Sequence, residues 1–566
     1  MCVGAVALEG PIIARDLRDI TVGSKSAKLF CINFLGLCPY PDVAPWSPPG
    51  ITAKPSTPRP EVSGKKPLQV VHFSDIHVDP WYTVGANHVC TKPICCRSYT
   101  TADSPGHNSN PAGPFGEHEC DAPLSLEQSM YKAIRQIAPD AIFSLFTGDI
   151  VDHAIWNTTQ NQNIHDINDV YGQMNSAGLK LVYGTIGNHE AHPANAFPPP
   201  SVSGASAQWV YDTISSGWFN WVGSAASSTV KQFGAYSVKY PGGNLRVISL
   251  NTNYYYVQNY WLYRKDMERD PAGQFAWLSK ELAAAEKAKE RVYILGHLPL
   301  GSSDAFHDGS NYFDQIVNRY SSTIAALFFG MFTSFAYPRN KCKHSKVKKS
   351  TNKTFTGHTH TDEFQISYSN YAQRNAKNAL MTSYIAPSMT PTSGHPAFRI
   401  YTVDPDTYGV LDVTTYIADM TNPTYQTSGP TWTKYYSAKE AYGPLVSPSI
   451  ASNAKAELTP AFWHNVTVAL EGNSAEFGKY YARKSRGWKP AACEGDCKAK
   501  EICQLRAGRA QDNCYEPKFG VHFSKRDGEE VDECEGTRVR AVLQRLVGRE
   551  DVLREKIEVA KRECQA

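Results

Sequence analysis

At 566 residues, with 42% hydrophobic and 20% charged residues, the chain is long enough for about two or three domains with a sizeable core. Its formal net charge of +3 gives no support for a nucleic-acid partner. No apolar run reaches the roughly 18 residues that a membrane-spanning helix needs, so we expect no such helix.

The first 40 residues have a helical pattern, and a proline-rich stretch follows them. Residues 41–67 contain eight prolines, which predicts a semi-rigid linker rather than a folded element. The chain does not begin with a basic segment, an apolar run and a small-residue cleavage site, so a signal peptide is missing from it. We expect an incomplete N-terminus, with unconventional export as the alternative.

From Leu68 onward, short apolar runs that predict buried strands alternate with helical patterns. The predicted strands cover residues 68–73, 141–146, 179–186, 245–250, 291–295 and 322–329, and the predicted helices cover residues 124–138 and 271–290. This alternation favours an α/β fold, a sheet flanked by helices with its site at the carboxyl ends of the strands. After about residue 420 the pattern becomes mainly helical, at residues 438–442, 461–470, 477–482 and 539–560.

Five short polar motifs each follow a predicted strand. They are Asp75-Ile76-His77, Gly148-Asp149, Gly187-Asn188-His189, Gly296-His297 and Gly357-His358-Thr359-His360. Carboxylate, amide and imidazole groups are suitable ligands for divalent metals. Two metals side by side neutralise phosphate charge, lower the pKa of a water and clamp the attacking oxygen in line, which points to phosphate-ester hydrolysis. One histidine after a strand is more often structural, but five such motifs in order favour a metal site.

The series SDIH, TGD, GNHE, GH and GHTH resembles the calcineurin-like metallophosphoesterases. Further segments, among them CTKPICCR, GDIVDHAIWNTT, GNHEAHPANAFPPP and AFWHNVT, resemble the acid sphingomyelinase family over roughly residues 68–515. The resemblance implies a metallophosphoesterase β-sandwich flanked by helices at residues 68–420. A disulfide-rich helical region would follow at residues 421–566, and a partial saposin-like helical segment at residues 1–40 would precede the linker.

The resemblance also assigns roles to the motif residues. It implies that one zinc is held by Asp75, His77, Asp149 and His360. It implies that the second zinc is held by Asp149, Asn188, His297 and His358, with Asp149 as the bridge. Manganese or iron would also suit such ligands. Either His189 or His153 would protonate the leaving alkoxide, and Glu190 would orient His189.

The N-terminal segment GPIIARDLRDI…FCINFLGLCPYP resembles the second half of a saposin-like domain, which normally holds six cysteines in three bridges. Only Cys2, Cys31 and Cys38 are present, so the first half with their usual partners is missing. A half domain cannot close its own apolar core. We therefore expect residues 1–40 to be poorly ordered.

The other cysteines predict disulfides and an oxidising compartment, because most of them lie in two tight clusters. The candidates are Cys90, Cys95, Cys96, Cys120, Cys493, Cys497, Cys503 and Cys514. Zinc binding by thiolates is the alternative, but their spacing does not form a pair of CxxC motifs. Sequons make Asn157 and Asn465 candidates for glycosylation. We expect a secreted protein, or one in a lumen like that of a lysosome or vacuole.

Residues 331–356 interrupt the chain between the last predicted strand and the fifth motif. They contain seven Lys or Arg residues and no acidic residue. One interpretation is a basic surface loop for anionic lipid. The other, which we favour, is a translated intron, because the end of a core strand is a poor place for a long loop. If the insertion is real, Thr354–Thr356 must replace Leu327–Phe329 in the sheet, or the two histidines will be displaced.

We therefore predict a dinuclear-metal phosphodiesterase. Its expected substrate is sphingomyelin or a related phospholipid, cleaved to a lipid alcohol such as ceramide and a phosphorylated head group such as phosphocholine. We expect a monomer that contacts membrane surfaces transiently. Two alternatives remain open: a nucleotide or head-group phosphodiesterase like the relatives that lack the saposin-like domain, and a catalytically inactive lipid-binding protein.

Overall fold

Two six-stranded sheets packed as a sandwich form the centre of the computed structural model, which describes residues 1–36, 38–330, 360–490 and 492–515. The first sheet has the order β12-β11-β10-β1-β2-β3 and the second the order β4-β5-β6-β7-β9-β8. The strands of the first sheet are β1 Leu68–Phe73, β2 Phe143–Phe146, β3 Val182–Gly184, β10 Ala397–Val403, β11 Val410–Ala418 and β12 Trp432–Ser437. Those of the second are β4 Tyr236–Lys239, β5 Leu245–Ser249, β6 Arg291–Leu295, β7 Ile324–Phe329, β8 Glu363–Tyr368 and β9 Ala379–Ile385.

Parallel pairing brings the motif-bearing strand ends to one edge of the sandwich. In the first sheet β1, β2 and β3 are parallel, with Phe73 opposite Phe146 and Phe146 opposite Gly184. In the second sheet β5, β6 and β7 are parallel, with Leu295 opposite Phe328. The carboxyl ends of neighbouring parallel strands lie together, so the loops after them can share one site.

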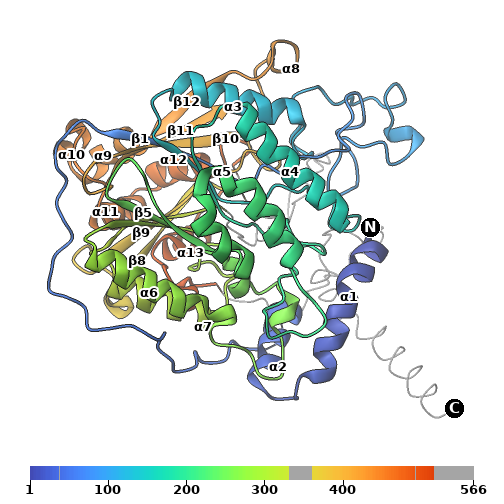
Figure 1. The fold of residues 1–566 in the computed structure, drawn as a ribbon. Coiled ribbons are helices and arrows are strands. Elements are labelled where there is room, and N and C mark those ends of the chain that lie inside the picture. The colour runs from blue at the N-terminus through green and yellow to red at the C-terminus, as the bar shows by residue number, and fades with distance from the viewer. Residues whose placement is uncertain (37, 331–359, 491, 516–566) are drawn as a thin grey trace.

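Helices cover the outer faces of both sheets, as Figure 1 shows. Those between residues 68 and 330 are α3 Leu124–Ile137, α4 Gln160–Ser176, α5 Gln208–Phe233, α6 Gln274–Lys287 and α7 His307–Arg319. Those of the C-terminal region are α8 Tyr425–Ser428, α9 Ala438–Val446, α10 Pro448–Ser452, α11 Pro460–Gly472, α12 Ser474–Lys484 and α13 Asp496–Leu505. The predicted α/β sandwich with flanking helices is confirmed.

The predicted strands differ from the observed ones mainly in length. The strands at 68–73 and 291–295 have the predicted bounds, whereas the strand expected at 179–186 is only the three-residue β3. β3 lies at the edge of its sheet and pairs only with β2 among the described strands. Fewer residues of the apolar run 179–186 therefore form hydrogen bonds with a neighbouring strand. The helix predicted at 271–290 begins as a 3-10 turn at Pro271–Gly273 and continues as α6.

The N-terminal segment packs on the rest of the protein through α1 Cys2–Asp19, α2 Lys25–Phe30 and a π-helical turn at Cys31–Leu35. One buried cluster contains Ile12, Ile13, Leu29, Phe30, Phe34, Val257, Tyr260, Leu262, Tyr263 and Phe306. The Asn33 amide also donates a hydrogen bond of 2.9 Å to the Tyr263 hydroxyl. The apolar face that we expected to leave residues 1–40 poorly ordered is therefore covered by residues 257–306.

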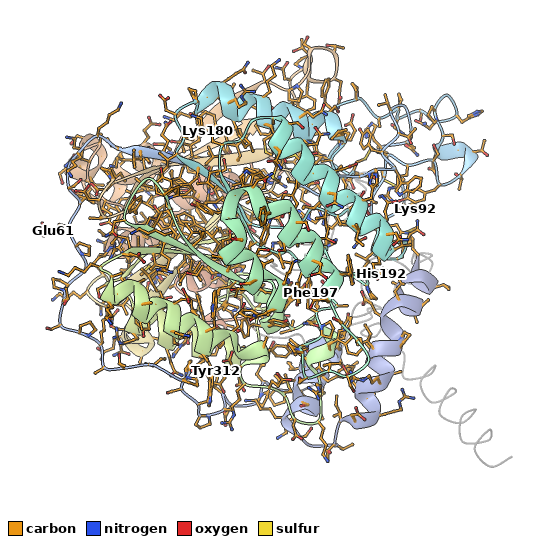
Figure 2. The ribbon with its side chains drawn as sticks, in the orientation of Figure 1. Glu61, Lys92, Lys180, His192, Phe197 and Tyr312 are labelled. Atoms are coloured by element: carbon orange, nitrogen blue, oxygen red, sulfur yellow. A yellow bond between two sulfur atoms is a disulfide. The ribbon has the colours of Figure 1, made fainter. Side chains whose placement is uncertain are left out.

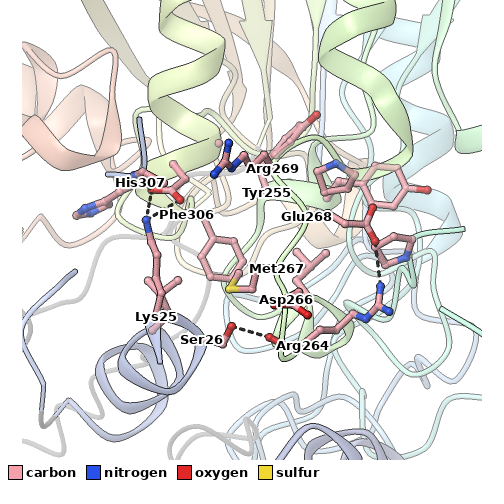
Figure 3. Close-up of a pocket in the computed structure, with 18 of the residues that line it drawn as sticks. Lys25, Ser26, Tyr255, Arg264, Asp266, Met267, Glu268, Arg269, Phe306 and His307 are labelled. Carbon is pink, nitrogen blue, oxygen red and sulfur yellow. Dashed lines mark hydrogen bonds and ion pairs between the residues drawn. The ribbon is translucent and has the colours of Figure 1, made fainter. Parts of the chain in front are cut away.

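A cavity of about 280 Å³ lies in this interface, as Figure 3 shows. Lys25 and Ser26 of α2 line one side, and Arg264 and Met267 line the other. Lys25 forms an ion pair with Asp308 at 2.7 Å across the interface. None of the predicted metal ligands that the structure describes lines this cavity.

The predicted linker at residues 41–67 crosses the surface in extended form, without a helix or strand in this described stretch. Hydrogen bonds from α7 hold it: the Tyr312 hydroxyl donates to the Ala44 carbonyl at 2.7 Å, and Arg319 Nε donates to the Thr52 carbonyl at 2.8 Å. Figure 2 labels Tyr312 and, farther along the linker, Glu61 at the left margin of the view. The linker is thus attached along its length.

All eight candidate cysteines form disulfides, so the thiolate alternative is wrong. The pairs are Cys90–Cys95, Cys96–Cys120, Cys493–Cys497 and Cys503–Cys514. Cys31 also pairs with Cys38, which corrects our expectation that the partners of both are missing. In the described part of the chain, no helix is both long enough and apolar enough to cross a membrane.

Candidate metal centre

Asp149 lies between two histidines that come from different sheets. Its Oδ2 atom is 3.5 Å from Nε2 of His77, which follows β1, and 3.2 Å from Nε2 of His297, which follows β6. All three side chains are fully buried. A single carboxylate with an imidazole on either side is the arrangement that a bridging metal ligand requires.

The four residues predicted for the first metal converge. Nε2 of His360 lies 3.7 Å from Oδ1 of Asp75, and His77 lies beside Asp149 as described above. Ligand atoms of Asp75, Asp149 and His297 all lie within 4.8 Å of one another, as do those of His77, His153 and His360. His77 thus lies beside Asp149, His360 lies beside Asp75, and the two carboxylates lie close to each other, so all four residues form one cluster.

Three of the four residues predicted for the second metal also meet. Asn188 Oδ1 is 3.0 Å from His297 Nε2, and His297 contacts Asp149. The Asn188 amide nitrogen donates to Asn195 Oδ1 at 2.7 Å, which turns the amide oxygen toward His297. The fourth residue, His358, lies outside the described residues.

The backbone is strained at the predicted ligands. Asp75, His77, Asp149 and His360 have φ angles of 50°, 45°, 63° and 46°, in the left-handed region that side-chain-bearing residues rarely adopt. Gly148, just before Asp149, has φ of 92°, and an added Cβ would lie 2.5 Å from the Gly187 nitrogen. Such strain persists where surrounding structure over-determines it, which is typical of functional sites.

Backbone carbonyls fix the ring orientation of two predicted ligands. His77 Nδ1 donates to the Val151 carbonyl and His297 Nδ1 donates to the Thr147 carbonyl, each at 2.7 Å. The hydrogen bond on Nδ1 leaves Nε2 as the acceptor nitrogen, and in both rings Nε2 faces Asp149. Histidine ligands of metals are commonly oriented in this way.

The donor set fits divalent cations. Both carboxylate oxygens of Asp75 and Nε2 of His77 are buried and have no hydrogen-bond partner among the described residues. Burial raises the pKa of Asp75 to about 7; the Asp149 carboxylate adds to this rise and His297 opposes it. Buried polar atoms of this kind are costly unless something else satisfies them, and a cation would do so.

His153 is held by a carboxylate that we did not predict, that of Asp121. His153 Nδ1 lies 2.6 Å from Asp121 Oδ1, and the His153 main-chain N–H donates to Oδ2 at 2.7 Å. Burial disfavours the charged imidazole, but Asp121 outweighs it and raises the pKa of His153. The His153 ring stacks on His77 with 3.8 Å between centroids, and 18% of its side chain is exposed. His153 thus lies between the cluster of predicted metal ligands and the solvent.

Whereas a carboxylate orients His153, a backbone carbonyl orients His189. Its main-chain N–H donates to Asp149 Oδ1 at 2.9 Å, and its Nδ1 donates to the Asp152 carbonyl at 3.0 Å. Burial lowers the pKa of His189 to about 4. Arg97 holds Asp152 in turn, because its Nη2 lies 3.0 Å from Asp152 Oδ2.

The hydrogen bond that the structure shows for the Glu190 side chain is to the loop after Asp149, and not to His189, where we expected it. Glu190 Oε1 accepts a hydrogen bond of 2.5 Å from the main-chain N–H of Ile150, next to Asp149. Burial raises the pKa of Glu190 to about 8, and the Asp149 charge adds to the rise. Glu190 therefore supports the loop that carries the central carboxylate.

The 331–356 stretch itself lies outside the described residues, but the described residues on either side of it, Gly330 and His360, both lie close to Asp75. A Cβ added to Gly330 would lie 2.9 Å from Asp75 Oδ2, and His360 Nε2 is 3.7 Å from Oδ1. β7 includes Leu327–Phe329, so these residues keep the place in the sheet that we expected Thr354–Thr356 to take; Thr354–Thr356 lie outside the described residues. His360 nevertheless lies in the cluster of predicted ligands. We expected the insertion either to change the strand before it or to displace the two histidines, and for His360 this expectation was wrong.

The residues that sequence reasoning missed are the supports behind the histidines: Asp121, Asp152 and Arg97. Asp121 and Arg97 directly follow Cys120 and Cys96, which form one disulfide. That adjacency is the only signal in the sequence that could have pointed to them. The two glycosylation candidates, Asn157 and Asn465, are both exposed.

Comparisons with known proteins agree with this geometry. Residues 68–330 match the family described as calcineurin-like phosphoesterase. Human sphingomyelin phosphodiesterase is 31% identical over 78% of this chain and 64% of its own length, and sphingomyelin phosphodiesterase 2 of Caenorhabditis elegans is 30% identical over 83% and 73%. Human acid sphingomyelinase-like phosphodiesterase 3b is 27% identical over 78% and 88%. The chain thus spans less than two thirds of the human sphingomyelin phosphodiesterase. It belongs to the sphingomyelin phosphodiesterase family of calcineurin-like phosphoesterases.

Proposed function

We propose that the protein is a dinuclear-metal phosphodiesterase that hydrolyses sphingomyelin, or a related phospholipid, to ceramide and phosphocholine. The observation that carries the proposal is the position of the Asp149 carboxylate between His77 and His297, which come from the two halves of the sandwich. The names of the relatives supply the substrate class.

The family implies a divalent metal, and the described residues include suitable ligand groups. We assign one zinc to Asp75, His77, Asp149 and His360. We assign the second to Asp149, Asn188, His297 and His358. When bound, such a pair neutralises the phosphodiester and lowers the pKa of a water.

The chain's own residues would supply the proton for the leaving group and hold the metal ligands in position. His153 would donate a proton to the leaving alkoxide, because Asp121 stabilises the charged form of its ring and its side chain reaches solvent. His189 has a carbonyl rather than a carboxylate behind it, which suits a neutral imidazole that contacts the phosphate. Glu190 and the carbonyls of Val151 and Thr147 keep the ligands in place.

The N-terminal segment is the expected route to lipid. An added Cβ at Gly4 of α1 would lie 2.3 Å from the carbonyl oxygen of Trp156, so the start of α1 packs against this residue, which follows His153 by three positions in the sequence. Val3 and Val6 on this end of α1 are exposed, as is Trp81, four residues after His77. Exposed apolar side chains on the start of α1 and shortly after His77 support a transient contact with a membrane surface.

We also propose an oxidising, non-cytosolic compartment, which the disulfides support. The five disulfides among the described residues and the exposed sequon asparagines Asn157 and Asn465 support a secreted protein or one in a lysosome-like or vacuole-like lumen. We propose that both asparagines are glycosylated, that the residue 1–40 segment is a partial saposin-like unit, and that the protein acts as a monomer.

The test is a substrate panel with the zinc-loaded protein. We expect turnover of bis(p-nitrophenyl) phosphate and release of phosphocholine from sphingomyelin in mixed vesicles, both lost in Asp149→Asn. Turnover of nucleotide phosphodiesters without sphingomyelin would establish the nucleotide-type alternative. A metal-loaded protein that binds vesicles but hydrolyses nothing would establish the inactive lipid-binding alternative.

A further inference from the structure

Arg486 is a fully buried arginine, 1% exposed, just beyond the end of α12. In the part of the chain that the structure describes, its guanidinium donates to carbonyls of residues 388–395, here called the 388–395 loop, which joins β9 to β10. Nη1 donates to the carbonyls of Ser388 at 2.9 Å, Thr390 at 2.8 Å and His395 at 3.1 Å. Nη2 donates to the Thr392 carbonyl at 2.6 Å.

The 388–395 loop in turn holds the backbone of two predicted ligands of the first metal. The main-chain N–H of Thr390 donates to the Asp75 carbonyl at 3.0 Å, and that of Ser388 donates to the His360 carbonyl at 3.4 Å. The Met389 N–H donates to the Ser74 carbonyl at 3.0 Å. Asp75 and His360 are also two of the residues held at positive φ, so their backbones need outside support.

We propose that Arg486 is a positioning residue for the metal that Asp75 and His360 share, acting through the 388–395 loop. This assignment rests on the metal sites of the proposed function. Four carbonyls of one short loop converge on a single planar donor group, so the loop has its observed shape only while the guanidinium is present. Loss of that shape releases the N–H groups that hold Asp75 and His360.

Lysine cannot take over this role. Its ammonium carries three donors at a single point, whereas the guanidinium spreads five donors over a plane and reaches all four carbonyls. Gly394 offers a second way to disturb the contact, because an added Cβ there would lie 2.5 Å from Arg486 Nε. Arg486→Lys and Gly394→Ala should therefore have the same effect on metal binding.

Arg291 provides a matched control. It is 6% exposed and also donates to carbonyls, those of Thr407 at 3.0 Å and Ile324 at 3.3 Å. It lies at the amino ends of β6 and β7, opposite the edge that carries His297. Arg291→Lys thus removes a buried guanidinium of the same kind without touching the loops of the metal centre.

The experiment measures metal, not turnover. The full-length parent and the variants are loaded with zinc or cobalt, and metal content, cobalt absorption, the rate of loss to a chelator and the thermal midpoint are recorded. We expect two metals in the parent and in Arg291→Lys. We expect Arg486→Lys and Gly394→Ala to retain one metal and to bind the other about 10- to 100-fold more weakly, the range for groups that orient ligands.

The outcomes separate this assignment from the proposed function. A parent that binds no metal contradicts both. A folded Arg486→Lys that keeps two metals with the parent's rate of loss contradicts only the role of Arg486. If Arg486→Lys does not fold, Gly394→Ala decides between the same results.

Discussion

Asp121 accepts one hydrogen bond from His153 on each of its two carboxylate oxygens. The ring Nδ1 is 2.6 Å from Oδ1 and the main-chain nitrogen is 2.7 Å from Oδ2, so both the rotation and the tautomer of the ring are set. The Thr392 hydroxyl also donates to Oδ1, at 3.3 Å. Asp121 directly follows Cys120, and the disulfide from Cys120 to Cys96 holds this part of the backbone in place. A buried disulfide next to Asp121 thereby supports the orientation of a histidine at the metal centre.

Asp121→Asn should lower kcat roughly 100-fold while KM and metal content stay near the parent values. An amide cannot stabilise a charged His153 ring, but it has the shape to keep the main-chain hydrogen bond. Steady-state kinetics on a soluble phosphodiester, together with metal analysis, check this.

Asp169→Asn, which changes a 64% exposed carboxylate on α4, is the control and should behave like the parent. An unchanged kcat in Asp121→Asn would show that His153 does not depend on this carboxylate. Loss of metal instead would mean that Asp121 supports the ligands rather than the proton donor.

Asp149→Asn should release both metals, because Asp149 contacts a predicted ligand of each. We expect bound metal to fall from two per chain to less than one, and turnover to fall at least about 1,000-fold, because a two-metal site clamps both the attacking and the leaving oxygen. Metal analysis after dialysis measures the first effect. Full activity in this variant would refute the assignment of the centre.

Removing residues 331–357 should leave the metal centre intact. Gly330 and His360 both adjoin Asp75, so Gly330 can connect directly to His358 without a long gap to span. We expect the shortened protein to have the parent's thermal midpoint within a few degrees and at least its turnover.

The native protein offers a direct check of the same segment. Under the translated-intron interpretation, mass spectrometry finds a tryptic peptide that runs from the Ile324 region to Glu363 without the insertion. Peptides from within residues 331–356 of the native protein would instead establish the loop as real.

Glu127→Gln should stabilise the fold at neutral and higher pH. Glu127 is fully buried on α3 beside the Tyr131 hydroxyl, and burial raises its pKa from 4.5 to about 8. Between these two values the folded state keeps a proton that the unfolded state has lost. The unfolding free energy of the parent therefore falls as pH rises through this window, by at most about 1.4 kcal/mol per pH unit from this group.

Thermal or urea unfolding from pH 4.5 to 8 checks this. The variant and the parent should coincide near pH 4.5 and diverge as pH rises, with the variant the more stable. Glu61→Gln, an exposed change in the linker, should follow the parent. Parallel curves for Glu127→Gln and the parent would show that Glu127 is not protonated in the fold.

Local signals in the sequence predicted much of the centre. A buried apolar run ending in a polar motif places Asp75, Asp149 and His297 at strand ends, because the carboxyl ends of parallel strands share an edge. The same signal could not show that Asp121 supports His153, or that Glu190 supports Ile150 rather than His189. Those contacts join loops that are distant in the chain, and hydrogen bonds of this kind leave no periodic pattern.

The sequence by itself determined the fold class, the disulfide-rich character and the ligand types, because these follow from hydrophobic period, cysteine clustering and residue chemistry. Only the tertiary structure decided that the apolar face of the N-terminal segment is covered by Tyr260, Tyr263 and Phe306. It alone revealed that Arg486 holds the loop behind Asp75 and His360. Both depend on packing between segments that are distant in the chain, where the partner of a side chain is set by the folded shape and not by its neighbours in sequence.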